Sequence, residues 1–333
     1  MLWADVTLFE RWKGFDSFAK LLVIPLLFVQ FRDSDRGEGV FTGYLFSCTA
    51  LLVATTIAMA IPPLAVRLLH FDYVLVANPA TQSGEFVICI FGLLYLIIGT
   101  RERKQWPWVL AGVAVILAML ANIFYFSTGR TAIVTIFVLF VLLVLKLRNV
   151  KTVSGLLAAA AVLGIIAWTS SPYLRERTEA VQGEVQKYEK MNERTSTGER
   201  LEFWKKSTEF IRQAPVIGHG TGSIRALFEK AAAGQAGAAG VTAANPHNQT
   251  LAVGTQLGVL GIAVLWAMWV AHLLAVCRGN TLAAWIGLVI VVQNITGSLF
   301  NSHIFDFVQG WTYVIGFGVA AGMILRNRAI AHR

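Results

Sequence analysis

Residues 106–126 read WPWVLAGVAVILAMLANIFYF, a run of 21 residues without a charged side chain. A helix needs about 20 consecutive apolar residues to cross the hydrocarbon core of a bilayer. After the short turn Ser127-Thr128-Gly129-Arg130, a second uncharged run covers residues 131–145. Two such runs joined by a four-residue turn predict a pair of antiparallel transmembrane helices.

Similar apolar runs, bounded by charges, occupy most of the chain on either side of this pair. Charged residues make up 14% of the 333 residues, against about a quarter in a typical soluble domain. The sequence therefore predicts an all-α polytopic membrane protein. The eight expected crossings lie near residues 40–61, 85–99, 106–126, 131–145, 152–170, 249–276, 281–300 and 307–325.

A ninth apolar run, Phe18 to Phe31, is short and is interrupted by Lys20 and Pro25. It is compatible with a tilted crossing, a re-entrant segment or the remainder of a longer N-terminal bundle. We therefore expect eight or nine transmembrane helices. Divided into membrane and loop segments, the chain consists of an N-terminal transmembrane bundle at 1–170, a loop domain at 171–248 and C-terminal transmembrane helices at 249–333.

Lysine and arginine in the short loops predict the orientation. Alternate loops hold 12 of these residues in 32 positions on one side, and 2 in 33 positions on the other. The basic set is expected in the cytoplasm, because translocating these charges is costly. The 78-residue stretch 171–248 then faces outward. Its 11 basic and 9 acidic residues nearly balance, so nucleic acid is not an expected partner.

The outer stretch contains two expected helices. A charged helix over 172–192 is followed by an amphipathic helix that begins after Ser196 and Thr197 and stops at Pro215. The apolar face of the second helix is expected at Leu201, Trp204, Thr208 and Ile211. This helix should therefore lie on the membrane or on the helical bundle.

Two glycine-containing segments follow these helices. The turn PVIGHGTGS at 215–223 lacks both a preceding strand and a following Lys-Ser or Lys-Thr pair, so it meets neither nucleotide-binding signature. The small-residue segment AAAGQAGAAGVTAA at 231–244 is a candidate for a hinge or lid.

Asn245-Pro246-His247-Asn248-Gln249 leads into the next apolar run, with Asn245 as the expected helix cap. This places His247 in the first helical turn, where the helix dipole favours a neutral, basic imidazole. A neutral histidine near neutral pH accepts a proton. The alternative is a histidine that only hydrogen-bonds a neighbouring carbonyl at the membrane interface.

Arg130 and Arg200 are the outer arginines of interest. Arg130 ends a tight turn at the membrane boundary, and Arg200 lies in the first turn of the amphipathic helix. A guanidinium fork matches the geometry of phosphate oxygens, so the two could hold a lipid pyrophosphate. The alternative for Arg130 is an arginine that snorkels to the interface.

Four motifs, in their order along the chain, resemble those of the O-antigen ligase family. They are STGR at 127–130, STGERLEFW at 196–204, PVIGHGTGS at 215–223 and NPHNQTL at 245–251. The related O-antigen polymerases and protein O-oligosaccharyltransferases share these features. The resemblance implies a GT-C-like architecture and transfer of a glycan from undecaprenyl pyrophosphate to a lipid A core sugar. It also implies the periplasmic face of the Gram-negative inner membrane as the place of reaction.

Carried over from this family, His247 matches the essential loop histidine, and Arg130 and Arg200 match the arginines near the donor pyrophosphate. The resemblance thus implies a general base, charge neutralisation of the leaving group and inversion at the anomeric carbon. Weaker supporting candidates are Asn248, His219, His303 and the carboxylate Glu85, which is expected at the outer end of its span. No cofactor is expected.

Asp33-Ser34-Asp35 has the form that metal-dependent glycosyltransferases use, but it lies in a predicted cytoplasmic loop between Arg32 and Arg36. No clustered carboxylate pair occurs in the short outer loops, so metal-independent catalysis is expected. Three other functions stay open within or beyond the family. They are polymerisation of a lipid-linked glycan, transfer to protein and, more remotely, membrane transport. Against transport, the centres of the spans lack the ionisable residues that carriers use.

Overall fold

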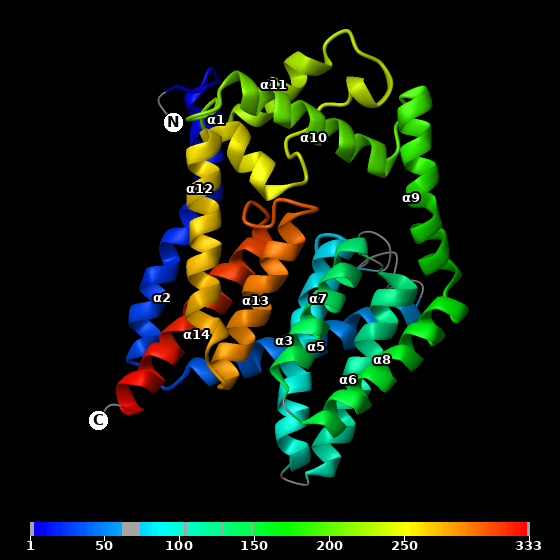
Figure 1. Ribbon diagram of the computed structural model, residues 1–333, viewed down its shortest axis with the longest axis vertical. Coiled ribbons are helices and arrows are strands. Elements are labelled where there is room, and N and C mark those ends of the chain that lie inside the picture. The colour runs from blue at the N-terminus through cyan, green and yellow to red at the C-terminus, as the bar shows by residue number, and fades with distance from the viewer. Residues whose placement is uncertain (1–2, 62–73, 103–104, 128, 148, 332–333) are drawn as a thin grey trace. The chain divides into compact units, whose positions relative to one another are not determined.

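The computed structural model describes residues 3–61, 74–102, 105–127, 129–147 and 149–331, and within these ranges it contains helices and no β-strand (Figure 1). Seven of the described helical segments are long and apolar enough to cross a membrane: Leu8–Arg32, Gly37–Ala60, Pro79–Gly99, Trp106–Phe126, Val150–Ser170, Gln249–Cys277 and Phe307–Ile330. Two shorter apolar helices of 17 residues each, α7 (Arg130–Lys146) and α13 (Leu282–Ser298), correspond to the other two expected crossings. The predicted all-α polytopic class is confirmed.

The interrupted run near the N-terminus forms α1 (Leu8–Ala19), a 3₁₀ turn at Lys20–Leu22 and α2 (Val23–Arg32). Together they make a 25-residue apolar segment, which is longer than the run visible in the sequence. Thr7 caps α1 in a capping box with Glu10. Lys20 is accommodated because its Nζ donates to the Asp306 carbonyl at 2.9 Å.

The chain divides into two compact units, residues 1–30, 179–278 and 294–318 in the first and residues 31–178, 279–293 and 319–333 in the second. The three-part division by sequence follows membrane and loop segments and stays a prediction. The second unit is built around α5 (Pro79–Glu102), which packs on α3 (Gly37–Ala60), α6 (Trp106–Ala121) and α7. A π-helical turn at Asn122–Phe126 follows α6, and α8 (Val150–Ser170) belongs to the same unit.

The first unit contains α10 (Ser196–Gln213), α11 (Ser223–Ala232), a 3₁₀ turn at Gly237–Gly240 and α12 (Gln249–Cys277). The helices α10 and α11 lie across the N-terminal end of α12 (Figure 1). Four of the described helices contribute to both units: α2, α9 (Pro172–Met191), α13 and α14 (Phe307–Ala331). The two expected helices, at 172–192 and after 196, are both present, with Thr195 rather than Ser196 or Thr197 as the cap of α10.

The buried face of α10 differs from the predicted one. Glu202, Phe203, Ser207 and Phe210 are buried, whereas Thr208 is exposed. The aromatic rings of Phe203 and Phe210 pack on Phe228 of α11, with centroid distances of 5.4 and 5.3 Å. The face is shifted because α10 packs on both α11 and α12, so contacts with two helices decide which side is covered.

The glycine-rich turn at 215–223 fills a break in α12. Gly258 has φ 63° and ψ −160°, a conformation open almost only to glycine, and it interrupts the helix. The turn pairs with the freed backbone groups, since His219 and Gly220 donate their N–H groups to the carbonyls of Thr255 and Gln256 at 3.0 and 2.8 Å. In return, the Val259 N–H donates to the Pro215 carbonyl at 2.8 Å. The amides that a phosphate loop would use are therefore occupied.

Candidate active site

His247 lies two residues before α12, not inside its first turn as the sequence predicted. The helix begins at Gln249, and the cap is Asn248, whose Oδ1 accepts the Leu251 N–H at 3.0 Å. Asn245 instead forms a local turn, because its Oδ1 accepts the N–H of His247 at 2.8 Å. His247 consequently adopts φ 54°, a left-handed conformation that is uncommon for a residue with a side chain.

A second segment, residues 299–306 between α13 and α14, supports the segment Asn245–Gln249. Asn248 Nδ2 donates to the Leu299 carbonyl at 3.1 Å, and the N–H of Ile304 donates to Gln249 Oε1 at 2.9 Å. Ser302 Oγ donates to Asn245 Oδ1 at 2.7 Å. The position of His247 is therefore set by contacts between segments about 50 residues apart in sequence.

Asn301 is the direct partner of the His247 ring. Its Oδ1 lies 3.1 Å from His247 Nδ1 and 3.4 Å from Asn245 Nδ2. Asn301 was not among the site residues predicted from the sequence. The only signal was its polar character next to Ser302 and His303, and such a signal does not identify a partner.

Arg200 and Glu199, at the start of α10, act electrostatically on His247. The pKa of His247 is lowered from its ordinary value of 6.5, first by burial and then by the positive charge of Arg200. The hydrogen bond to Asn301 and the negative charge of Glu199 oppose this shift. The predicted neutral form is thus favoured, but burial rather than a helix dipole is its main cause.

The ring of His247 also lies against that of Phe203, with a centroid distance of 6.3 Å and 25° between the planes. Phe203 is 5% exposed and belongs to the apolar cluster between α10, α11 and α12. The cluster thereby fixes the orientation of the imidazole plane. Of the three residues that sequence analysis ranked first, Arg200 and His247 belong to the first unit and interact electrostatically.

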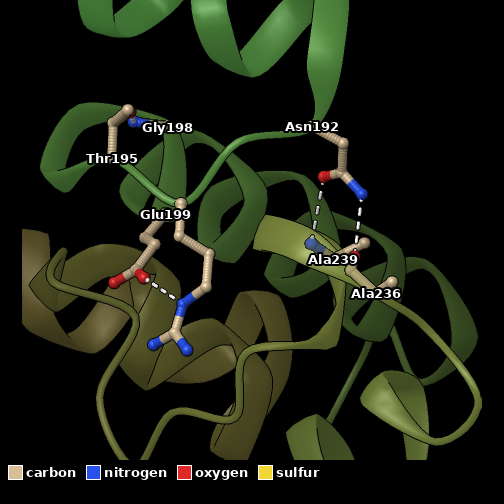
Figure 2. A network of polar contacts seen from close by, with 7 residues as sticks. Asn192, Thr195, Gly198, Glu199, Ala236 and Ala239 are labelled. Atoms are coloured by element: carbon tan, nitrogen blue, oxygen red, sulfur yellow. Dashed lines mark hydrogen bonds and ion pairs between the residues drawn. The ribbon is translucent and has the colours of Figure 1, made fainter.

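Polar contacts connect the residues that follow α9 with the start of α10 and with the small-residue segment 231–244 (Figure 2). Arg194 pairs with Glu199 at 3.0 Å, while Asn192 donates to the Ala236 carbonyl at 2.8 Å and accepts the Ala239 N–H at 3.2 Å. Figure 2 shows Asn192 pointing at this small-residue segment, the hinge or lid candidate of the sequence. The segment is therefore fastened to the end of α9 by both functional groups of one side chain.

A polar cavity of about 480 Å³ adjoins this network in the first unit. Its lining includes Tyr188, Glu202 and Lys206, and Tyr188 donates to Glu202 at 2.7 Å. Burial and the neighbouring carboxylate raise the pKa of Tyr188 to about 12. Lys206 forms an ion pair with Glu202 at 3.8 Å. Such a mixture of donors and acceptors suits the hydroxyl groups of a sugar.

The two other outer histidines have different surroundings. His219 Nε2 lies 2.8 Å from the Phe210 carbonyl, and its ring lines a cavity of about 540 Å³ with Trp3, Asp5 and Lys230. His303 is only 6% exposed, and a methyl group added at Gly297 would lie 1.8 Å from its ring. Burial lowers the pKa of His303 to about 4. A ligand-binding role for either residue stays a prediction.

Arg130 and Glu85 belong to the second unit. Arg130 is half-buried and is the first residue of α7, capped by Gly129. A side chain at Gly129 would approach Ala80 of α5 to 3.1 Å, so this glycine allows close helix packing rather than access for a ligand. Glu85 is buried inside α5, not at its end, because the helix already begins at Pro79; its Oε2 accepts the Tyr44 hydroxyl at 2.6 Å.

No group of three His, Cys, Asp or Glu side chains among the described residues lies close enough to hold a metal ion. Asp33 of the Asp-Ser-Asp motif pairs with its neighbour Arg32 at 3.2 Å, and both side chains are exposed. This arrangement is that of a solvated loop. Metal-independent catalysis stays a prediction.

These features define a polytopic helical membrane protein whose loop region presents a histidine with a lowered pKa, under the electrostatic influence of an arginine. Residues 115–266, slightly less than half of the chain, match the family model of the O-antigen ligases. The match confirms the resemblance found in the motifs and supports placing the chain in the O-antigen ligase family of membrane glycosyltransferase-like enzymes. The matched segment includes Arg130, Arg200 and His247. A comparison with curated proteins finds no match.

Proposed function

We propose that the chain transfers an O-antigen glycan from undecaprenyl pyrophosphate to a sugar hydroxyl of the lipid A core. The reaction would take place at the periplasmic face of the Gram-negative inner membrane, without a metal. The observation that carries this proposal is the environment of His247, which is half-buried and has its pKa lowered by burial and by the charge of Arg200. The family match over the same residues supports it.

In the proposed reaction, His247 removes the proton of the acceptor hydroxyl while its oxygen attacks the anomeric carbon of the donor. The bond between that carbon and the pyrophosphate oxygen breaks, and undecaprenyl pyrophosphate leaves with the bonding electrons. Arg130 and Arg200 neutralise the charge that develops on it. Direct displacement inverts the anomeric configuration. A positioned base contributes about 10²-fold to 10⁴-fold to such a reaction.

The polar cavity beside α10 provides donors and acceptors for the sugars of the glycan. His219 and His303 are supporting candidates for acceptor binding, and Asn248 and Glu85 are supporting candidates without an assigned role. Polymerisation of lipid-linked glycan and transfer to protein use the same donor chemistry, so they differ from ligation only in the acceptor.

The deciding experiment incubates the purified full-length protein with lipid-linked glycan and each acceptor in turn: lipid A core, a second lipid-linked glycan, and a Ser- or Thr-containing protein. We expect transfer to lipid A core that survives EDTA and falls about 10²-fold or more in His247→Ala. Full activity of His247→Ala would disprove the base assignment, and loss of activity in EDTA would disprove metal independence. Product on another acceptor alone would reassign the enzyme within the family.

A further inference from the structure

The side chains around His247 form a chain of hydrogen bonds whose direction can be worked out atom by atom. It starts at the backbone N–H of His247, which lies 2.8 Å from the Asn245 side chain. A backbone N–H only donates, so the Asn245 atom that faces it must be the amide oxygen. The Ser302 hydroxyl donates to the same oxygen at 2.7 Å. The two terminal atoms of the Asn245 amide are therefore assigned.

The other terminal atom of Asn245, the Nδ2 amide nitrogen, points at Asn301 at a distance of 3.4 Å. Because this nitrogen only donates, Asn301 must present its amide oxygen in turn. The same oxygen lies 3.1 Å from His247 Nδ1. An amide oxygen cannot donate, so Nδ1 has to carry the hydrogen. A neutral imidazole has one N–H group, and its Nε2 is consequently the unprotonated nitrogen.

We propose that Asn245 and Asn301 are positioning residues that hold His247 in the Nδ1–H tautomer, so that Nε2 is the atom that accepts the acceptor's proton. This inference rests on the proposed function for its catalytic consequence. The hydrogen on Nδ1 follows from the hydrogen-bond geometry, and the unprotonated Nε2 then follows for the neutral imidazole. Both asparagines act through His247 and are not assigned any contact with substrate.

The amide nature of Asn301 has a physical reason. A carboxylate at position 301 would also accept the Nδ1–H, but its charge would favour the imidazolium form and raise the pKa of His247. An amide orients the ring without adding charge. The charged groups that act on His247 are then Arg200 and Glu199 at the start of α10, and Glu199 is already paired with Arg194.

Two substitutions of nearly identical shape separate positioning from simple support of the loop. In Asn301→Asp, the carboxylate still accepts from both Asn245 Nδ2 and His247 Nδ1, so the tautomer is retained. In Asn245→Asp, the oxygen that binds the His247 N–H is retained but the donor to Asn301 is lost. The Asn301 amide then turns its nitrogen toward the introduced carboxylate and His247, which makes Nδ1 an acceptor and moves the hydrogen to Nε2.

The first measurement is the nitrogen chemical shift of His247 in the full-length protein, with the signal assigned by its loss in His247→Ala. We expect the Nδ1–H signature in the unchanged protein and in Asn301→Asp, and the Nε2–H signature in Asn245→Asp. The same signature in all three proteins would overturn the proposal. This measurement needs no activity, so it stands even if the proposed function fails.

The second measurement is the rate of glycan transfer as a function of pH. We expect kcat of Asn245→Asp to fall about 10²-fold or more, with KM for the donor little changed. Asn301→Asp should keep most of its kcat at its own optimum, while the acid limb of its pH profile moves to higher pH. Asn149→Asp is the matched control, because Asn149 caps α8 with its side-chain oxygen, and aspartate caps equally well.

Equal losses in Asn245→Asp and Asn301→Asp, with unshifted pH profiles, would indicate loop support only and would overturn the proposal. If transfer depends on His247 while Asn245→Asp has the kcat of the unchanged protein, the positioning role fails and the proposed function stands. If no acceptor is glycosylated but the tautomer inverts as expected, the proposed function fails and the tautomer assignment stands.

Discussion

At the scale of single residues, the titration of His247 is the property most directly tied to the proposed chemistry. Its pKa is lowered by burial and, next, by the charge of Arg200. A general base acts in its neutral form, so kcat/KM should rise with pH through the pKa of this residue. Any substitution that removes the neighbouring positive charge should therefore move that rise to higher pH.

We predict that Arg200→Gln moves the acid limb of the pH profile of kcat/KM to higher pH and lowers the maximal rate about 10²-fold. The shift occurs because the pKa of His247 rises when the positive charge is lost. Arg200→Lys keeps the charge, so its acid limb should stay near that of the unchanged protein. Identical profiles for the two variants would show that Arg200 exerts no electrostatic effect on His247.

His303 should link stability to pH. Burial lowers its pKa from 6.5 to about 4 in the folded protein. Between these pH values the unfolded chain binds a proton that the folded protein does not, so stability falls as pH falls through this window. At about 1.4 kcal/mol per pKa unit, the total is on the order of 3 kcal/mol.

We therefore predict that His303→Gln reduces the loss of stability between about pH 6.5 and pH 4. The measurement is the free energy of unfolding in detergent at several pH values. The slope decides the result, because the substitution also changes packing against Gly297 at every pH. A slope as steep as that of the unchanged protein would disprove the assignment.

At the scale of elements, the break in α12 and the turn at 215–223 form one structure. A methyl group at Gly258 would lie 2.4 Å from the Val216 carbonyl carbon, and the backbone there is in a region that costs other residues about 1–3 kcal/mol. We predict that Gly258→Ala lowers the thermal midpoint and the rate of transfer together, since the turn can no longer dock.

Gly164→Ala in α8 is the control for this prediction, because nothing lies within 4 Å of the added methyl group. It should keep or raise the midpoint, as alanine favours a helix over glycine by about 1 kcal/mol. If both variants had the same midpoint as the unchanged protein, the break in α12 would not depend on a glycine.

The elements also show which features can be predicted from sequence. The apolar helices were predictable because membrane crossing demands a minimum apolar length, which any single run displays. The start of α12 was predicted three residues too early, since Asn245 and Asn248 are both suitable caps and Pro246 suits a first helical turn. Tertiary contacts decided between them, because the Asn245 oxygen is used by His247 and Ser302.

The candidate site was predictable only in part. His247 and Arg200 are charged or titratable residues at helix starts, and such residues are visible in the sequence. Asn301 was missed because its role depends on a distance of 3.1 Å to a ring 54 residues away in sequence. The buried face of α10 differs from the predicted face for a related reason. Helical periodicity indicates that one side of a helix is buried, but it does not show which neighbouring helices bury it.

At the scale of the whole molecule, the distribution of lysine and arginine predicts that residues 171–248 face the periplasm and residues 277–280 the cytoplasm. Two cysteines can report this. The native Cys277 is exposed, whereas Cys48 and Cys89 are buried and can be replaced by serine. Gly183 in α9 is exposed, and a side chain added there meets no other atom within 4 Å, so Gly183→Cys should be tolerated.

In intact cells with a permeable outer membrane, we predict that a membrane-impermeant maleimide labels Gly183→Cys in a background where Cys277 is serine. It should label Cys277 only after the inner membrane is opened. The prediction follows because 12 basic residues on one side against 2 on the other leave a large energetic preference for a single orientation. Labelling in the reverse order would place His247 in the cytoplasm, where a periplasmic glycan donor cannot reach it, and would therefore disprove the proposed function along with the orientation.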